Sequence, residues 1–351
     1  MNSKDKGKAG LASRTVEFKP DSRNLFFHIL TACNLKCRHC YINPSQHGTE
    51  TLDLDTLKAW LRLFSMEGSR LLKSVEDTNV IFLGGEPTMS PHLADAIKYA
   101  RALGYASITV DTNGYLFNDI LERVTPQEVD FFSFSLDGAE PSTNDPIRGS
   151  GSFDVCTAGI RRAVSMGFNV SSIFTCSRMN IHDLPRMPDL LKSLGVKRFF
   201  IQVIGIRGKS TEAEGREGVQ LRREEWQEVV PRAAARAAEL GLHVTWPRVF
   251  LDLDEKFECA GVVAENYFVF PNGRVYTCPL CEDYPLHAYE IVEDRLLQRP
   301  PVNEMQLYEL SIPEGCVMNR LLHPGNIEYD QSGRPLHKIA CCMLKEEILP
   351  A

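Results

Sequence analysis

Apolar and polar residues follow two distinct patterns between residue 25 and about residue 205. Short apolar runs predict buried strands, and apolar residues that recur every three or four positions predict amphipathic helices between them. The expected strands cover residues 25–30, 80–83, 107–110, 131–136, 169–174 and 198–204. The expected helices cover residues 54–64, 91–103, 116–123, 153–166 and 184–194. This order predicts an α/β fold with a parallel sheet, either an open doubly wound sheet or a partial barrel.

The carboxyl end of each expected strand carries polar residues or glycine. The segments in question are residues 31–33, 84–87, 111–114, 135–138, 175–177 and Gln202. Parallel α/β folds bind ligands at this end of the sheet, because the loops that leave the strands meet there. We therefore expect the functional site on this rim.

The pattern changes after Gly205. Residues 207–223 are charged and contain glycines, and we interpret residues 209–223 as a solvated loop, with a lid over the barrel mouth as the alternative hypothesis. We then expect a helix over 224–240, a strand over 242–246, and a hairpin with strands 267–270 and 274–277. The domains expected are a disordered arm at 1–20, a core domain at 21–245 and a cysteine-rich domain at 246–351.

Composition narrows the class of protein. The chain has 351 residues, of which 43% are hydrophobic and 24% are charged, as in ordinary globular proteins. Its formal net charge is −7, so nucleic acid is not an expected partner. No apolar stretch approaches the roughly 18 residues of a membrane-spanning helix, and no secretory signal is recognised. We expect a cytoplasmic protein without a membrane partner, in which thiols stay reduced.

The 11 cysteines are the unusual feature of the composition. An odd count in a chain of this size argues against a disulfide scaffold. Cys156 and Cys176 are expected to be small packing residues, with a substrate contact at Cys176 as the alternative. The other cysteines form an N-terminal group, Cys33, Cys37 and Cys40, and a C-terminal group, Cys259, Cys278, Cys281, Cys316, Cys341 and Cys342.

The spacing of the N-terminal group suits an iron–sulfur cluster. Its three thiols lie within eight residues, and no histidine pair follows at zinc-finger spacing. A closed zinc site needs four protein ligands, whereas three cysteines can hold a cubane cluster that keeps one iron open. A zinc site that borrows a distant cysteine is the alternative.

Two motifs resemble those of one enzyme superfamily. Residues 31–41, Thr-Ala-Cys-Asn-Leu-Lys-Cys-Arg-His-Cys-Tyr, resemble the signature loop of the radical S-adenosylmethionine (radical SAM) enzymes, and Gly84-Gly85-Glu86-Pro87 resembles their second motif. The resemblance covers about residues 25–205 and implies a partial (β/α)6 TIM-like barrel. It also implies that Cys33, Cys37 and Cys40 hold a [4Fe–4S] cluster whose open iron is chelated by S-adenosylmethionine.

Further contacts to S-adenosylmethionine follow from the same resemblance. The implied cofactor-binding residues are His39 at the adenine, Gly85 and Glu86 at the methionine amino group, Asn113, Ser135 and Asp137 at the ribose or carboxylate, and Arg148 at the methionine carboxylate. A planar guanidinium suits a contact with a carboxylate. The alternative for each polar side chain is a turn, cap or solvated loop residue.

The C-terminal cysteines resemble a second family pattern. Cys259-x13-Gly273-x4-Cys278 resembles the start of the SPASM and twitch extensions, which bind auxiliary [4Fe–4S] clusters. The chain then departs from the full SPASM pattern, since Cys281, Cys316, Cys341 and Cys342 replace its regular run. We therefore expect a small cysteine-rich extension with at least one auxiliary cluster, and one is favoured over two. The metal ligands would be drawn from the six C-terminal cysteines.

The resemblance implies a radical SAM enzyme of the oxidoreductase or maturase type. Such an enzyme cleaves S-adenosylmethionine reductively to a 5′-deoxyadenosyl radical that abstracts hydrogen from a peptide or small-metabolite substrate. A reducing partner such as ferredoxin or flavodoxin would supply the electron, and the auxiliary cluster would transfer electrons or bind substrate. One alternative is cofactor biosynthesis on a tetrapyrrole or pterin-like precursor. Another is a non-catalytic electron carrier or redox sensor, for which the Gly84–Pro87 motif has no use.

Overall fold

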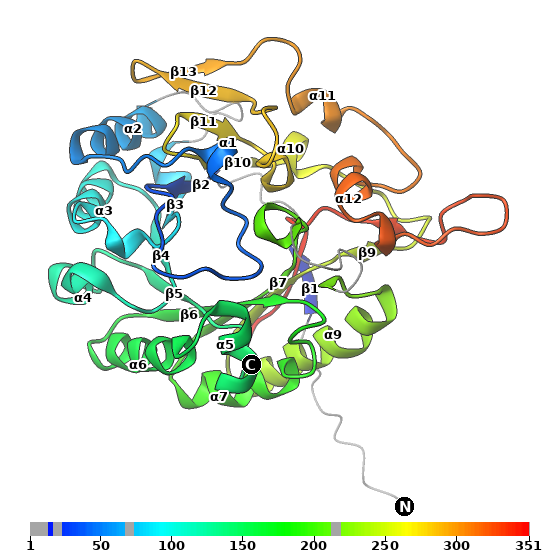
Figure 1. Ribbon diagram of the computed structural model, residues 1–351, viewed down its shortest axis with the longest axis horizontal. Coiled ribbons are helices and arrows are strands. Elements are labelled where there is room, and N and C mark those ends of the chain that lie inside the picture. The colour runs from blue at the N-terminus through cyan, green and yellow to red at the C-terminus, as the bar shows by residue number, and fades with distance from the viewer. Residues whose placement is uncertain (1–12, 17–22, 67–73, 212–218, 351) are drawn as a thin grey trace, which may run out of the picture.

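The strands of the chain curve into a ring that helices cover from outside (Figure 1). The computed structural model describes residues 13–16, 23–66, 74–211 and 219–350. Most of the strands join one sheet, in the order β1-β15-β8-β7-β6-β5-β4-β3-β2-β10-β11-β12-β13. The predicted α/β class and partial barrel are confirmed.

Seven strands form the parallel centre of this sheet. They are β2 (Arg23–His28), β3 (Thr78–Leu83), β4 (Ser107–Thr112), β5 (Phe131–Ser135), β6 (Val170–Cys176), β7 (Arg198–Val203) and β8 (His243–Pro247). Each pairs in parallel with the next along the chain. Their positions agree with the predicted strands to within a few residues, because the apolar runs that predict them are the buried strand interiors.

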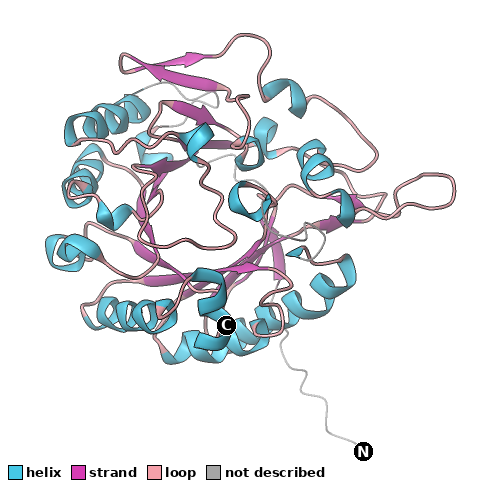
Figure 2. Ribbon diagram, in the orientation of Figure 1, coloured by secondary structure: helices cyan, strands magenta, loops and turns pink. Residues whose placement is uncertain are grey.

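Alternate strand residues face the two sides of the sheet. Phe27, Phe82, Val110, Phe134 and Ile201 are fully buried in the main hydrophobic core. The helices cover the outer side of the ring (Figure 2), and they are α2 (Leu54–Met66), α3 (Leu93–Leu103), α4 (Ile120–Arg123), α6 (Ser152–Ser165), α7 (Met187–Ser193) and α9 (Arg223–Glu239). The core therefore lies between the sheet and this outer layer.

Local signals explain where some helices begin and end. The Asp53 carboxylate accepts a hydrogen bond of 2.8 Å from the Thr56 backbone nitrogen, which caps the start of α2. Helix α3 ends at Gly104, which adopts a left-handed φ of 90° as the sequence predicts. Helix α5 (Pro141–Arg148) is not predicted, because the internal Pro146 is normally a helix breaker.

The C-terminal segment is built into the barrel sheet instead of lying apart from it. Strand β10 (Glu265–Val269) pairs in parallel with β2, and β15 (Lys345–Ile348) pairs antiparallel with β8. The predicted hairpin is confirmed as β10 and β11 (Arg274–Tyr276), and Gly273 at its turn has a φ of 82°. Residues 246–351 therefore extend the sheet at both edges of its parallel part.

Strand β1 (Ser13–Val16) pairs with β15. This strand differs from the disordered arm expected over residues 1–20, whose other residues lie outside the described ones. Part of the expected loop or lid at 209–223, residues 212–218, also lies outside them. The described residues contain no helix that is both long and apolar enough to cross a membrane.

The remaining described elements are short. They are α1 (Pro44–His47), β9 (Phe250–Leu251), α10 (Ala260–Val263), β12 (Tyr289–Val292), β13 (Arg295–Gln298), α11 (Met305–Tyr308), α12 (Val317–Leu322) and β14 (Lys338–Ile339). Most of them belong to the C-terminal segment. Among them, α10, α11 and α12 contribute residues to the pocket that the C-terminal cysteines line.

Candidate functional site

The loop that carries Cys33, Cys37 and Cys40 leaves β2 and crosses the area that the strands enclose (Figure 1). Cys33 is exposed, whereas Cys37 and Cys40 are half-buried. Desolvation by the surrounding loop raises the pKa of Cys33 to about 11, although its side chain is partly exposed, and burial also raises the pKa of Cys37. Thiols in such surroundings lose their protons when a bound metal supplies the opposing positive charge. Cys33 and Cys37 therefore fit a metal cluster better than free thiolates.

The two glycines before Glu86 hold the rim of β3 against the cysteine loop. The Gly85 nitrogen donates to the Leu30 carbonyl at 3.1 Å, and the Glu86 nitrogen donates to the Ala32 carbonyl at 3.0 Å. A Cβ on Gly85 would lie 2.1 Å from the Ala32 carbonyl oxygen. Glycine is needed here because the backbone of the cysteine loop occupies the space that a side chain would fill.

The Glu86 carboxylate is fully engaged inside the rim. Its Oε1 accepts hydrogen bonds from Thr88 Oγ1 at 2.6 Å and Thr112 Oγ1 at 2.9 Å, and its Oε2 accepts one from the Asn113 nitrogen at 2.7 Å. Asn113 Nδ2 in turn donates to Asn34 Oδ1 at 2.8 Å and lies 3.8 Å from Cys33 Sγ. Glu86 thus orients Asn113 toward the cysteine loop.

Asp137 gathers two of the predicted site residues at the end of β5. Its Oδ2 lies 2.9 Å from His39 Nε2 and 2.7 Å from Arg148 Nε, and its Oδ1 accepts from the Thr175 nitrogen at 2.7 Å. Burial alone would raise the pKa of Asp137, but Arg148 and His39 lower it to about 2. The carboxylate is therefore ionised and joins the cysteine loop to β5 and α5.

The contacts with Asp137 change the interpretation of His39 and Arg148. The side chain of His39 is only 10% exposed, which excludes the solvated loop histidine. In the described part of the chain its Nδ1 is buried without a hydrogen-bond partner. Arg148 Nε is taken by Asp137, so a ligand carboxylate would have to contact the terminal guanidinium nitrogens. The Arg148 carbonyl also accepts a hydrogen bond from Cys37 Sγ at 3.7 Å.

The remaining N-terminal predictions concern Ser135, Cys156 and Cys176. Ser135 is half-buried at the last position of β5, and its carbonyl accepts from Cys156 Sγ at 3.6 Å. Cys156 and Cys176 are 1% and 0% exposed within the main core. Their prediction as packing residues is confirmed.

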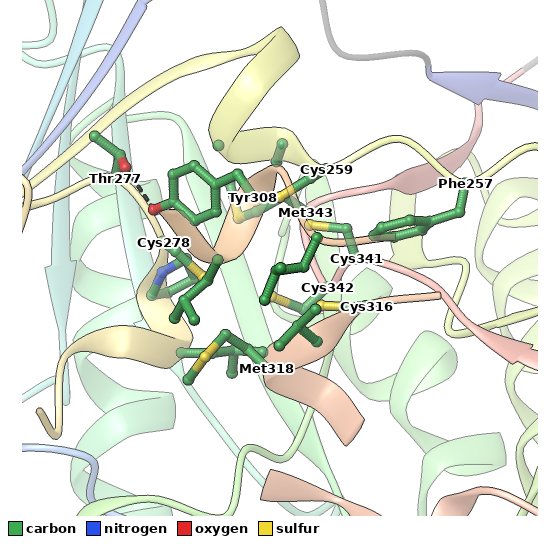
Figure 3. A pocket seen from close by; sticks show the side chains of 17 residues that line it. Phe257, Cys259, Thr277, Cys278, Tyr308, Cys316, Met318, Cys341, Cys342 and Met343 are labelled. Carbon is green, nitrogen blue, oxygen red and sulfur yellow. Dashed lines mark hydrogen bonds between the residues drawn. The ribbon is translucent and has the colours of Figure 1, made fainter. Parts of the chain in front are cut away.

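Five of the six C-terminal cysteines line one pocket (Figure 3). They are Cys259, Cys278, Cys316, Cys341 and Cys342. Cys281 is not among the lining residues; it is fully buried, and its thiol lies near that of Cys278. The structure thus brings both adjacent cysteines, Cys341 and Cys342, to the pocket.

The pocket wall between the cysteines is mostly apolar, with Phe257, Leu307, Met318 and Met343 among its residues. Burial raises the pKa of Cys259 to about 12, whereas a hydrogen bond from Cys342 lowers the pKa of Cys341 to about 7. Among the described residues, no three His, Cys, Asp or Glu side chains converge as they would on a single metal ion. Several thiols around an apolar pocket fit a cluster, whose positive charge would compensate the thiolates.

Glu304 supports the pocket and is not predicted from the sequence. It is fully buried, and its carboxylate accepts hydrogen bonds from the backbone nitrogens of Thr277 at 2.7 Å, Cys278 at 3.1 Å and Ala288 at 3.1 Å. Burial raises its pKa to about 7. No sequence signal marks this acid, because its partners lie far from it along the chain.

Comparison with known proteins identifies the domain that carries the first cysteine group. Residues 28–191 match the family model described as "Radical SAM superfamily". The match includes Cys33, Cys37, Cys40 and the Gly84–Pro87 motif, and it confirms the radical SAM domain predicted from them. Members of this superfamily use a [4Fe–4S] cluster and S-adenosylmethionine, which agrees with the cofactors predicted for this domain.

Two relatives found by sequence are named for different activities. The chain is 31% identical over 206 residues to the Fe-coproporphyrin III synthase of Methanosarcina barkeri, which covers 56% of this chain and 49% of that protein. It is 24% identical over 170 residues to a probable GTP 3′,8-cyclase of Saccharolobus islandicus, which covers 48% of this chain and 53% of that protein. The chain therefore matches about half the length of these curated relatives.

A solved structure shares the fold over more of the chain. Streptococcus suis SuiB superposes with a TM-score of 0.65 at 15% sequence identity, covering 86% of this chain and 74% of that chain. SuiB has also been solved with its precursor peptide SuiA and with S-adenosylmethionine. At this level of identity the likeness supports the fold.

Proposed function

We propose that this chain, whose residues 28–191 form a radical SAM domain, abstracts hydrogen from a peptide or small-metabolite substrate with the help of an auxiliary cluster. The observation that carries the proposal is the cysteine loop at the barrel mouth, fastened by Gly85 on one side and by Asp137 on the other. A [4Fe–4S] cluster bound there would supply the electron that cleaves S-adenosylmethionine to a 5′-deoxyadenosyl radical.

The chain's own residues would hold and orient this chemistry. Cys33, Cys37 and Cys40 would be the three cluster ligands. Asn113 is held by Glu86 beside Cys33, where its amide can donate to a polar group of the bound cofactor. His39 is held by Asp137 and keeps a buried Nδ1 for the adenine side of the same ligand.

Other rim residues would complete the cofactor site. Gly85 allows the rim to approach closely, and Arg148 would face the methionine carboxylate with its terminal nitrogens while Nε stays on Asp137. Ser135 is the last residue of β5 and lies on the same rim. We propose no acid–base role for Asp137, because it is ionised and enclosed by its partners.

The C-terminal cysteines would hold the auxiliary cluster. Five thiols line one pocket, and four ligands are enough for a cubane. Cys281 would support Cys278 from behind, because it lies outside the pocket and contacts that thiol. A reducing partner of the ferredoxin or flavodoxin type would supply electrons.

A second candidate for the substrate is a cofactor precursor of the tetrapyrrole or pterin type. It is favoured by the two sequence relatives, which are named for a coproporphyrin product and for GTP. The peptide candidate is favoured by the likeness to SuiB, which covers 86% of this chain.

Isotope transfer separates these two candidates. The anaerobically reconstituted full chain is incubated with S-adenosylmethionine and a strong reductant, together with a tetrapyrrole precursor, GTP or peptides, each deuterated at carbon. Mass spectrometry of the 5′-deoxyadenosine then shows whether deuterium has moved into it. Transfer from a peptide supports the first candidate, and transfer from the tetrapyrrole precursor or GTP supports the second. The absence of transfer from every compound, with the clusters verified, would contradict both.

A further inference from the structure

One short segment after β7 contacts both groups of cysteines. The Lys209 nitrogen donates to the Cys40 carbonyl at 2.8 Å. Gly208 has a φ of 56°, and a Cβ there would lie 2.5 Å from the same carbonyl oxygen. On the other side, the Gly208 nitrogen donates to Asp283 Oδ2 at 2.7 Å. Residues 207–209 are therefore packed between the N-terminal cysteine loop and the C-terminal cysteine segment.

Arg207 is the charged residue at the centre of this segment. Its side chain is 17% exposed, and its guanidinium lies 4.6 Å from the ring centre of Tyr41, the neighbour of Cys40. Its Nη1 donates to the carbonyl of Pro279, the neighbour of Cys278, and pairs with the carboxylate of Glu282. One guanidinium thus contacts residues next to a cysteine of each group.

Arg207 contacts Tyr41, which packs against an apolar cluster. A single hydrophobic cluster includes Ile42, Phe270, Leu280 and Met318, and partly buried residues packed against it include the cysteines Cys40, Cys278 and Cys342. Fixed charges act over longer distances in such surroundings than in water, because the effective dielectric constant is lower. Arg207 and Glu282 are therefore placed to act on both cysteine groups.

Arg207 is positively charged in the folded chain. Burial opposes it, but Glu282, Tyr41 and Cys342 together hold the pKa of Arg207 above its ordinary value. Glu282 is itself only 2% exposed in its side chain, so the pair is enclosed. Burial raises the pKa of Glu282 to about 7, and the contact with Arg207 favours its charged form.

We propose that Arg207 and Glu282 are positioning residues that set the reduction potentials of the clusters bound by the two cysteine groups. The inference rests on the proposed function, since it needs both clusters. Reduction adds one electron to a cluster that is already surrounded by thiolates, so a nearby cation favours the reduced form and a nearby anion disfavours it. Removing Arg207 should lower the potentials, and removing the charge of Glu282 should raise them.

The test is a redox titration of the anaerobically reconstituted full chain, followed by electron paramagnetic resonance. We expect Arg207→Gln to lower the reduced-to-oxidised ratio of both clusters about tenfold at a fixed solution potential, which is about 59 mV for a one-electron couple. Glu282→Gln should shift the ratio in the opposite direction. The double variant should return toward the unmodified chain, because it removes both charges.

Two control variants separate charge from packing. Arg207→Lys keeps the charge but loses the planar contacts, and its potentials should stay close to those of the unmodified chain. Arg236→Gln removes an exposed cation that pairs with Asp189 on the outer surface, and it should shift neither cluster. Equal shifts in Arg207→Lys and Arg207→Gln would contradict the inference, because packing would then be the cause.

Iron content is measured on the same samples. A chain that binds no cluster would overturn the proposed function and this inference together. Clusters that form normally, with potentials unmoved by Arg207→Gln and Glu282→Gln, would overturn this inference alone.

Discussion

Asp137 joins the cysteine loop to the rim of the barrel. Its carboxylate contacts the imidazole of His39 and the guanidinium of Arg148, and His39 lies inside the cysteine loop. Its place on the rim could be predicted, because it follows an apolar strand. Its pairing could not, because residues 39, 137 and 148 meet only when the ring of strands has formed.

Replacing Asp137 should destabilise the fold. Asp137→Asn leaves Arg148 buried without its anion, and loss of one partner of a buried ion pair costs about 3 kcal/mol or more. Denaturant unfolding of the cluster-free chain measures this free energy. The control, Asp189→Asn, breaks an exposed pair with Arg236 and should cost less than about 1 kcal/mol. Equal costs would contradict the role given to Asp137.

The pKa of Asp137 predicts how the free energy of unfolding depends on pH. The pKa of Asp137 is lowered to about 2 in the folded chain from an ordinary value of 3.8. Its contribution is therefore complete above pH 3.8 and is lost as the pH falls through about 2. Asp137→Asn should lack this part of the acid dependence when unfolding is measured between pH 5 and pH 2. An unchanged pH profile would show that the carboxylate is not the group responsible.

At the scale of elements, the alternating strands and helices could be predicted closely, because buried strands read as apolar runs. The contact between the Gly84–Pro87 turn and the cysteine loop could not be predicted, because it joins two loops 50 residues apart. Arg207 belongs to a stretch that was interpreted as charged, yet its side chain is largely buried. This burial could not be predicted, because it depends on partners such as Glu282. Strand β15 was not predicted either, because its sequence Lys-Glu-Glu-Ile is mostly charged.

The turn after β3 offers a test at this scale. In Gly85→Ala the new Cβ would lie 2.1 Å from the Ala32 carbonyl, so one of the two loops must move. We expect a loss of about 3 kcal/mol in the free energy of unfolding and weaker retention of iron by the first cysteine group. Gly325→Ala, where a Cβ meets nothing within 4 Å, is the matched control and should change neither quantity. If both variants behave alike, the close approach at Gly85 has no energetic role.

At the scale of the whole molecule, the C-terminal segment closes onto the barrel. Strands β10 and β15 join the sheet, and the pocket with five cysteines lies within the same segment. The resemblance of the C-terminal cysteines to the SPASM and twitch pattern implied an auxiliary cluster, but the shared sheet could not be predicted, because pairing between residues 23–27 and 265–269 leaves no local signal. This arrangement places Arg207 between the two cysteine groups.

Iron content tests the two-cluster arrangement. Reconstituted chain should bind about eight irons, four for each cubane. Replacing Cys259 and Cys316 with alanine should leave about four, because both cysteines line the C-terminal pocket. Cys156→Ala should keep about eight, because that thiol is a packing residue of the core. Iron content that is unchanged in the Cys259 and Cys316 variant would contradict the assignment of the pocket.

The central claim is that Cys33, Cys37 and Cys40 support reductive cleavage of S-adenosylmethionine. The most direct test measures 5′-deoxyadenosine formed by the anaerobically reconstituted chain with a strong reductant. We predict clear product from the unmodified chain and from Cys156→Ala, and none above background when Cys33, Cys37 and Cys40 are replaced by alanine. A chain with verified clusters that forms no 5′-deoxyadenosine, or a triple variant that forms as much as the unmodified chain, would contradict the claim.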